Sequence, residues 1–103
     1  VVVHSDTFEH VPDPLKGLRE CRRILRDGGV CLFTAPIITG RLTRLRYGLP
    51  PSYHGSPSHA DESMRVHAEF GADLWCYVFE AGFKECRIAT FCYPSGIALT
   101  AIA

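Results

Sequence analysis

The sequence predicts an α/β fold with a mixed sheet, and three observations predict it. An apolar, β-branched segment opens the chain. An amphipathic segment with helical spacing then leads through a Gly-Gly pair into a second apolar segment, within the first 36 residues. Two further apolar segments flank a turn at Pro94–Gly96. The first three elements form a βαβ unit, whose strands are expected to be parallel and whose crossover is expected to be right-handed.

The first half of the chain divides into clear elements. We expect a buried strand of the parallel type at Val1–Ser5, because it lacks the alternation of a one-sided sheet. After a loop, a helix begins at Asp13–Pro14, since aspartate is a good N-cap and proline suits the first helical position. Gly28–Gly29 is expected to supply its left-handed C-terminal cap. A second buried strand follows at Val30–Ala35.

The second half begins with a segment of different composition. Residues 37–68 are rich in proline, glycine and histidine, and we expect a long insert or lid there, because long irregular segments in small domains are usually functional. The segment Gly40–Tyr47 is a candidate for a short helix. A second amphipathic helix is expected at Phe70–Ala81. Strands at Lys84–Tyr93 and Ile97–Ala103 complete the chain as a hairpin.

Composition limits the classes of partner. The 103 residues carry 11 basic and 11 acidic side chains, so no overall charge favours nucleic acid or an anionic membrane, and no segment has the length and hydropathy of a membrane span. We interpret the one basic cluster, Arg41, Arg44 and Arg46, as a solvated helix face. The five cysteines contain no C-x-x-C pair and are expected to be reduced, which favours a cytoplasmic protein.

Three segments carry a resemblance to a known family. They are Ser5–Pro14, which contains Glu-His-Val and Asp-Pro, Cys21–Gly29, which ends in Gly-Gly, and Phe79–Phe83, which precedes the hairpin. In this order and spacing they resemble the C-terminal half of a class I S-adenosylmethionine-dependent methyltransferase (type 11/12-like), over essentially the whole chain. The sequence departs from the family because it has no G-x-G-x-G loop and no acidic residue after a second family strand to hold the ribose.

The resemblance implies a fold and a function. Residues 1–103 would form a single half-domain, with a partial Rossmann-like sheet of family strands 4-5-7-6, parallel with one antiparallel strand. A longer parent protein would transfer a methyl group from S-adenosylmethionine to an unidentified small-molecule acceptor, and this chain alone would bind the cofactor weakly or not at all. The alternative is a non-catalytic half-domain that acts as an assembly or interaction module.

The resemblance also implies site residues. Cofactor contacts are expected at His4, Ser5, Asp6 and Thr7, around the end of the first strand, where α/β sheets bind ligands. Within the insert, Tyr53 and His54 are expected near the acceptor. His10 is a candidate general base for an acceptor that must lose a proton.

A metal site is an alternative interpretation of the same loop. Asp6, Glu9 and His10 resemble, as D-x-x-E-H, the E-x-x-E-H metal site of some O-methyltransferases, and His59 or His67 would complete the set. Carboxylates and imidazole suit Mg²⁺ or Mn²⁺. Because a Glu-His pair is common in methyltransferases without a metal, the metal-free loop is the primary prediction.

The resemblance finally implies a mode of self-association. Family strand 4 is central and paired on both sides, so the first strand of this chain would present an unpaired apolar edge. We therefore expect a homodimer in which two copies of Val1–Val3 pair antiparallel across a twofold axis.

Overall fold

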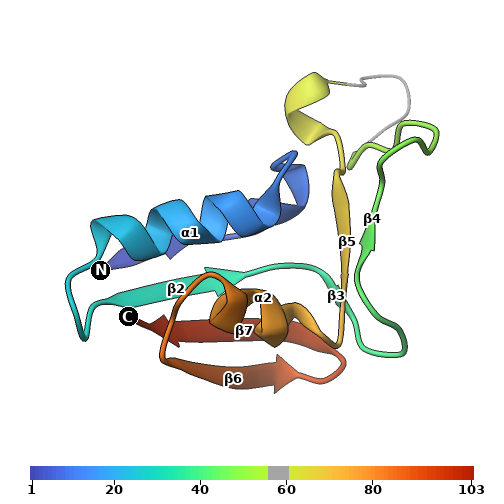
Figure 1. Ribbon diagram of the computed structural model, residues 1–103. Helices are drawn as coiled ribbons and strands as arrows, with labels where there is room; N and C mark the ends of the chain where they lie inside the picture. The colour runs from blue at the N-terminus through green and yellow to red at the C-terminus, as the bar shows by residue number, and fades with distance from the viewer. Residues whose placement is uncertain (56–60) are drawn as a thin grey trace.

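The computed structural model describes residues 1–55 and 61–103, and its main feature is a four-stranded mixed sheet (Figure 1). The strand order is β1-β2-β7-β6. β1 pairs parallel with β2, and β7 pairs antiparallel with both β2 and β6, so one strand runs against the other three. The predicted mixed α/β class is confirmed. The bounds are β1 (Val2–His4), β2 (Val30–Thr34), β6 (Glu85–Cys92) and β7 (Ser95–Ile102).

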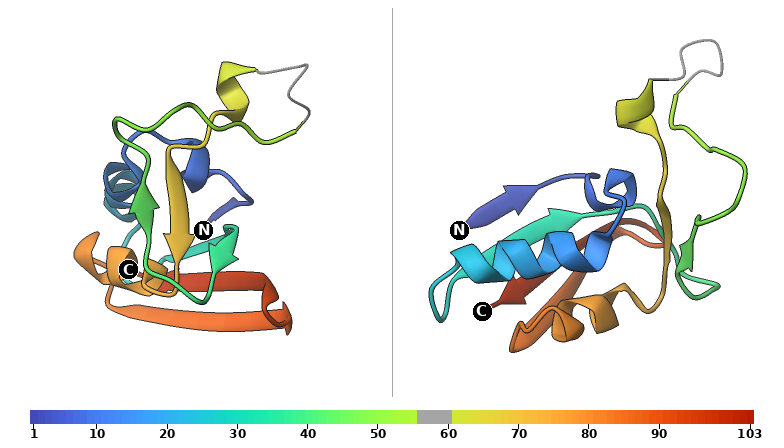
Figure 2. Two further views of the ribbon diagram at one scale, coloured as in Figure 1. Left: turned by 90° about the vertical axis from the view of Figure 1, so that its right-hand side faces the viewer. Right: turned by 45° about the horizontal axis from the view of Figure 1, so that its top comes forward.

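Two helices, α1 (Pro14–Ile24) and α2 (Leu74–Glu80), cover the same face of this sheet (Figure 2). Leu18 of α1 and Val78 of α2 are fully buried against the sheet residues Phe33 and Leu99. On the opposite face, Leu32 is 38% exposed. The prediction that the first two strands are buried on both faces is therefore wrong, because the helices of the described chain pack on one side only.

The N-terminal boundary of α1 is as predicted. The side chain of Asp13 accepts a hydrogen bond from the backbone N–H of Lys16 at 2.9 Å, and Pro14 occupies the first helical position. The predicted C-terminal cap is wrong in position. The helix ends at Ile24, Leu25 is already extended, and Gly28, with φ of +75°, lies in the following turn that leads into β2.

The predicted insert, residues 37–68, and the three residues after it build a second, three-stranded sheet beside one end of the main sheet (Figures 1 and 2). β5 (Ala68–Gly71) lies in its centre, parallel to β3 (Ile37–Ile38) and antiparallel to β4 (Arg44–Leu45). A 3-10 helix, η3 (Glu62–Met64), precedes β5. The helix considered at Gly40–Tyr47 is wrong, because β4 occupies this segment.

The predicted helix Phe70–Ala81 is wrong in its first part. Phe70 belongs to β5, and α2 begins only at Leu74. Gly71 passes so close to residues 41–43 that a Cβ atom at this position would overlap their backbone. The Asp73 carboxylate accepts hydrogen bonds from the Thr43 backbone N–H at 2.7 Å and hydroxyl at 2.6 Å. These tertiary contacts keep Gly71 in β5, and Ala72 and Asp73 form the turn that leads into α2.

The basic cluster has a partner that sequence analysis missed. Arg41, Arg44 and Arg46 all donate hydrogen bonds to the carboxylate of Glu69, which projects from β5 between them. Arg41 and Arg44 lie 2.5 and 2.8 Å from Glu69 Oε2. The interpretation as a solvated helix face is therefore wrong, since the cluster belongs to a strand and its loop and surrounds a carboxylate.

The C-terminal hairpin is confirmed, with β7 starting two residues earlier than expected, at Ser95. The Tyr93–Pro94 peptide bond at its turn is cis. Within residues 1–55 and 61–103, neither helix has the length and apolar character needed to cross a membrane.

Candidate functional site

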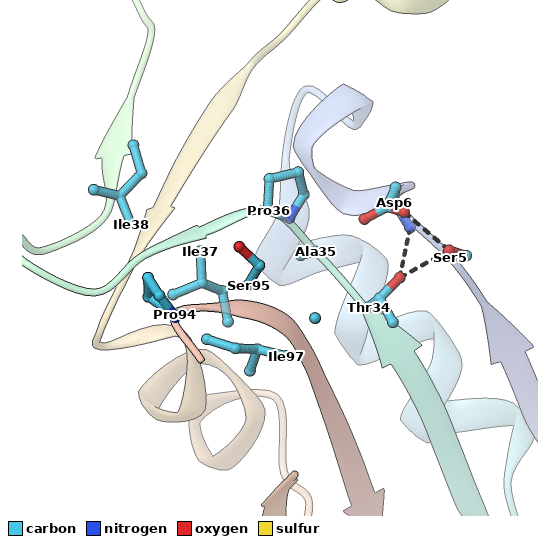
Figure 3. Close-up of a pocket in the computed structure, with 11 residues that line it drawn as sticks. Ser5, Asp6, Thr34, Ala35, Pro36, Ile37, Ile38, Pro94, Ser95 and Ile97 are labelled. Atoms are coloured by element: carbon cyan, nitrogen blue, oxygen red, sulfur yellow. Dashed lines mark hydrogen bonds between the residues drawn. The ribbon is translucent and has the colours of Figure 1, made fainter. Parts of the chain in front are cut away.

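A cavity of about 570 Å³ lies at the carboxyl ends of β1 and β2 (Figure 3). Its volume falls in the usual range of small-molecule sites, roughly 300–1,000 Å³. The loop after β1 and the end of β2 form one wall, β3 forms another, and the turn of the β6–β7 hairpin closes a third side. The lining residues are Ser5, Asp6, Thr34, Ala35, Pro36, Ile37, Ile38, Pro94, Ser95, Gly96 and Ile97.

Ser5, Asp6 and Thr34 make the polar side of the cavity and hold one another in place. The Ser5 hydroxyl lies 2.8 Å from the Thr34 hydroxyl and donates to Asp6 Oδ2 at 3.0 Å. The backbone N–H of Asp6 donates to the Thr34 carbonyl oxygen at 3.1 Å. This links the ends of two adjacent strands and leaves the Asp6 carboxylate exposed. Asp6 also has a φ of +45°, which L-residues seldom adopt and which is common at ligand sites.

The structure brings only two of the four predicted cofactor residues to this cavity. Ser5 and Asp6 line it, whereas His4 and Thr7 do not. The His4 ring packs in the core, stacked on Phe33 with ring centroids 5.2 Å apart, and burial lowers its pKa. The Thr7 hydroxyl donates to the Ser5 carbonyl oxygen at 2.9 Å and so supports the loop.

Sequence analysis missed Thr34 and the hairpin turn as lining residues. A signal for Thr34 was present, because it is the polar residue at the carboxyl end of the second predicted strand, next to the first strand of the βαβ unit. The hairpin turn carried no such signal. Its position depends on β7 pairing with β2 over five residue pairs from Val30 to Thr34.

The predicted acceptor residues lie outside this cavity. The Tyr53 hydroxyl donates to Glu62 Oε1 at 2.7 Å, and neither residue lines the cavity. His54 packs edge-on against the ring of His10, with centroids 4.9 Å apart.

His54 joins a separate cluster with Glu9 and His10. These two residues belong to the 3-10 helix η1 (Phe8–His10), which follows the loop after β1. One ligand atom from each of the three side chains lies within 4.8 Å of the others. Glu9 is only 2% exposed, and burial, as the largest effect, raises the pKa of its carboxyl. Of the other residues considered for a metal, Asp6 and His67 are not in this cluster, and His59 lies outside the described residues.

A comparison with protein families identifies the first third of the chain. Residues 1–33 match the family described as a methyltransferase domain. The match spans β1, the Ser5–Asp6 loop, η1, α1 and most of β2, and so includes Ser5 and Asp6 of the cavity. None of the curated proteins matches the chain. The predicted resemblance to a class I S-adenosylmethionine-dependent methyltransferase is thus confirmed over these residues, and the chain is methyltransferase-like there.

Proposed function

We propose that the cavity at the carboxyl ends of β1 and β2 is the place where an S-adenosylmethionine-dependent methyltransferase brings its methyl donor to an acceptor. The observation that carries this proposal is that Ser5 and Asp6 lie in the methyltransferase-like residues 1–33 and also line the cavity. In open α/β sheets, ligands bind outside the carboxyl ends of the strands. The order β1-β2-β7-β6 supports a Rossmann-like assignment, in which these are family strands 4, 5, 7 and 6.

The residues that line the cavity fit the methionine end of the cofactor. That end carries an ammonium, a sulfonium and a carboxylate, and its net charge is positive. The exposed Asp6 carboxylate offers a counter-charge to the two cationic groups, and Ser5 and Thr34 offer hydroxyl groups. The adenosine end has no such fit, since the 103 residues contain no G-x-G-x-G loop. The proposal therefore assigns to this chain only the methionine end and the acceptor side of the site.

Methyl transfer from a sulfonium depends more on alignment of the donor with the acceptor and on exclusion of water than on acid–base groups. S-adenosylmethionine supplies, when bound, a methyl group on a positively charged sulfur. Asp6 stabilises positive charge beside the cavity, and Pro36, Ile37 and Ile97 exclude water from it. His10 does not line the cavity, so the proposal gives it no part in removing a proton from the acceptor.

A second cavity supports a small-molecule acceptor with an apolar part. It has a volume of about 380 Å³ and is lined largely by apolar side chains, among them Trp75, Ile88 and Leu99. Ile37 and Ile97 line both cavities, so the two are neighbours separated by these side chains. An acceptor in the second cavity would approach the methyl donor past Ile37 and Ile97.

Calorimetric titration of the 103-residue chain with S-adenosylmethionine tests the proposal that only half of the cofactor site is present. We expect a dissociation constant weaker than micromolar, because each tenfold loss of affinity corresponds to about 1.4 kcal/mol and the contacts to adenine and ribose are not supplied. A micromolar dissociation constant would contradict this division of the site.

A non-catalytic half-domain is the second candidate, and the missing G-x-G-x-G loop is the observation that favours it. Such a module would not bind the cofactor in the cavity at any concentration. For either function we propose a reducing compartment such as the cytoplasm, since none of the five cysteines, all of which lie in the described residues, forms a disulfide.

A further inference from the structure

The cluster of Glu9, His10 and His54 lies apart from the cavity, and the inference about it does not rest on methyl transfer. Its three side chains come from two distant parts of the sequence. Glu9 and His10 lie in η1, and His54 is positioned by its backbone N–H, which donates to the Met64 carbonyl oxygen at 3.0 Å. Tyr53 forms a β-bridge with Arg65, so the chain segment before His54 is also fixed.

Glu9 is the observation that requires an explanation. Its side chain is only 2% exposed, and neither carboxylate oxygen has a hydrogen-bond partner among the described residues. A buried carboxylate without a partner is costly to a fold, and buried charges in proteins are normally paired or bound to metals. Its Oε1 atom lies 3.8 Å from His10 Nε2, so the carboxylate points toward the two histidines.

His10 is oriented as a metal ligand would be. Its Nδ1 atom lies 2.9 Å from the Arg65 carbonyl oxygen, which can only accept, so Nδ1 carries the proton. In the neutral ring Nε2 then presents a lone pair toward Glu9. A backbone carbonyl that fixes one ring nitrogen and leaves the other for a cation is the usual second-sphere arrangement of metal-binding histidine.

His54 supplies the third donor and an entry path. Its ring meets that of His10 at 90°, and the residue is exposed, so an ion can reach the cluster from solvent on this side. The mutual separations of up to 4.8 Å exceed the roughly 3.3 Å between donors around tetrahedral Zn²⁺ with bonds of about 2.0 Å. Glu9 Oε1 and His10 Nε2 are already 3.8 Å apart, so closing this difference takes small side-chain rotations, the largest of them in the exposed His54, and no movement of the backbone.

We propose that Glu9, His10 and His54 bind one divalent transition-metal ion of the Zn²⁺ type. Two imidazoles and one carboxylate are a ligand set that zinc uses when a fourth position is left open, and imidazole favours such ions over Mg²⁺ or Ca²⁺. The open position faces the exposed side of His54. This ligand set differs from the one expected from the sequence, because His54 takes the place of His59 or His67 and Asp6 is not included.

A second cluster, His4, Cys21 and Cys31, has similar spacing but a different character. It lies between α1 and the sheet, where Cys31 is fully buried in the core. The Cys31 thiol already lies 3.8 Å from His4 Nε2 and so has a partner. We interpret it as core packing, and the experiment below distinguishes the two clusters.

A calorimetric titration of the protein with Zn²⁺ alone tests the proposal. We expect one ion per chain, and an affinity at least about 10-fold lower in both Glu9→Gln and His54→Gln. His67→Gln is the matched control. It replaces another histidine of the same segment, whose backbone N–H donates to the Glu9 carbonyl oxygen and whose side chain is not in the cluster, and it should bind Zn²⁺ like the unchanged protein. His54 is exposed, so its variant keeps the test valid even if Glu9→Gln fails to fold.

Co²⁺ provides an independent readout of the ligand atoms. Bound to one carboxylate and two imidazoles, it should give visible ligand-field bands without a sulfur-to-cobalt charge-transfer band. A sulfur charge-transfer band would assign the ion to cysteine ligands, such as those of the second cluster, and overturn the proposal. Failure to bind Zn²⁺, or equal affinities in His54→Gln and His67→Gln, would also overturn it.

Discussion

At the residue scale, Glu69 shows how one side chain organises three arginines. Burial alone would raise the pKa of its carboxyl, but hydrogen bonds from Arg41, Arg46 and Arg44 outweigh this effect and hold the pKa at about 2, against an ordinary value of 4.5. The folded state therefore favours the ionised form of Glu69 more than the unfolded state does. The carboxylate stabilises the fold above pH 4.5, and this contribution is lost as the pH falls through the pKa of about 2.

We expect Glu69→Gln to lower the free energy of unfolding at pH 7 by about 2 kcal/mol, between the values for exposed and fully buried ion pairs. The difference from the unchanged protein should shrink between pH 4.5 and pH 2, because the unchanged protein loses its ionised carboxylate there. Urea unfolding at pH 7 and pH 3 measures both effects. Glu80→Gln, a substitution of an exposed carboxylate, is the control and should change stability by less than about 0.5 kcal/mol. Equal stability of Glu69→Gln and the unchanged protein at pH 7 would contradict the account.

Site residues that directly follow a predicted strand could be identified from the sequence, whereas contacts between residues far apart in the sequence could not. Ser5 and Asp6 could be predicted because they follow a strand directly, and a strand's carboxyl end marks a site in this architecture. The proximity of Glu9 to His54 could not be predicted, because these residues lie 45 positions apart in the sequence and His54 belongs to the insert. The sequence contained the basic cluster, but the carboxylate that it surrounds lies 23 to 28 positions away.

At the scale of elements, the junction between β5 and α2 depends on the absence of a side chain at Gly71. A Cβ atom there would lie 2.6 Å from the Thr43 backbone nitrogen and would also overlap backbone atoms of Arg41 and Leu42. Backbone atoms cannot move aside as a flexible side chain can. Gly71 therefore allows β5 to pack beside the loop that leads into β4.

Gly71→Ala should destabilise the protein by about 2 kcal/mol or more, because the added methyl group forces this loop away from β5. Gly40→Ala provides a comparison, since a Cβ atom at Gly40 meets nothing within 4 Å and should change stability by less than about 0.5 kcal/mol. Thermal unfolding of the two variants side by side makes the measurement. Equal melting temperatures would show that the close approach at Gly71 does not determine this junction.

The same junction explains why the predicted helix Phe70–Ala81 was wrong at its start. Periodicity placed Phe70 on the inner face of a helix, and Phe70 is indeed fully buried, but as a residue of β5. A single buried aromatic fits both a helix and a strand, and the pairing of Ile37 with Phe70 decides between them. By contrast, α1 carried its own start signal in Asp13 and Pro14, and its N-terminus could be predicted.

At the scale of the whole molecule, β1 leaves the main sheet with an open edge in the described structure. It is the first strand in the order β1-β2-β7-β6 and pairs only with β2. Val3 is 70% exposed beside this edge. Exposed edge strands with apolar side chains are prone to pair with another chain.

We propose that two copies of the chain pair through β1, and we expect sedimentation at tens of micromolar protein to give twice the 11.4 kDa chain mass. Val3→Lys should shift the equilibrium to monomers, because a charged side chain beside the edge opposes pairing. Leu42→Lys, at a position that is 71% exposed and away from this edge, should remain dimeric. A monomer for the unchanged protein, or dimers of Val3→Lys as stable as those of Leu42→Lys, would contradict this interface.

The architecture as a whole was the most predictable part, for a physical reason. The βαβ unit and the hairpin depend on local signals, namely apolar segments, a helix N-cap and a turn, and these gave the mixed α/β class. The second sheet depends on pairing between short segments 23 to 33 positions apart, and its two-residue strands leave no periodic signal in the sequence.

Binding of the cofactor in the cavity is tested most directly by titrating the ¹⁵N-labelled protein with S-adenosylhomocysteine and monitoring the amide chemical shifts. NMR is suitable because it detects weak binding. The account predicts shifts confined to the cavity at the ends of β1 and β2, at Ser5, Asp6, Thr34 and residues 95–97. It also predicts smaller shifts at the same ligand concentration in Asp6→Asn than in Asp61→Asn, a control outside this cavity. An absence of shifts at millimolar ligand, or shifts located elsewhere on the protein, would contradict the assignment of this cavity to methyl transfer.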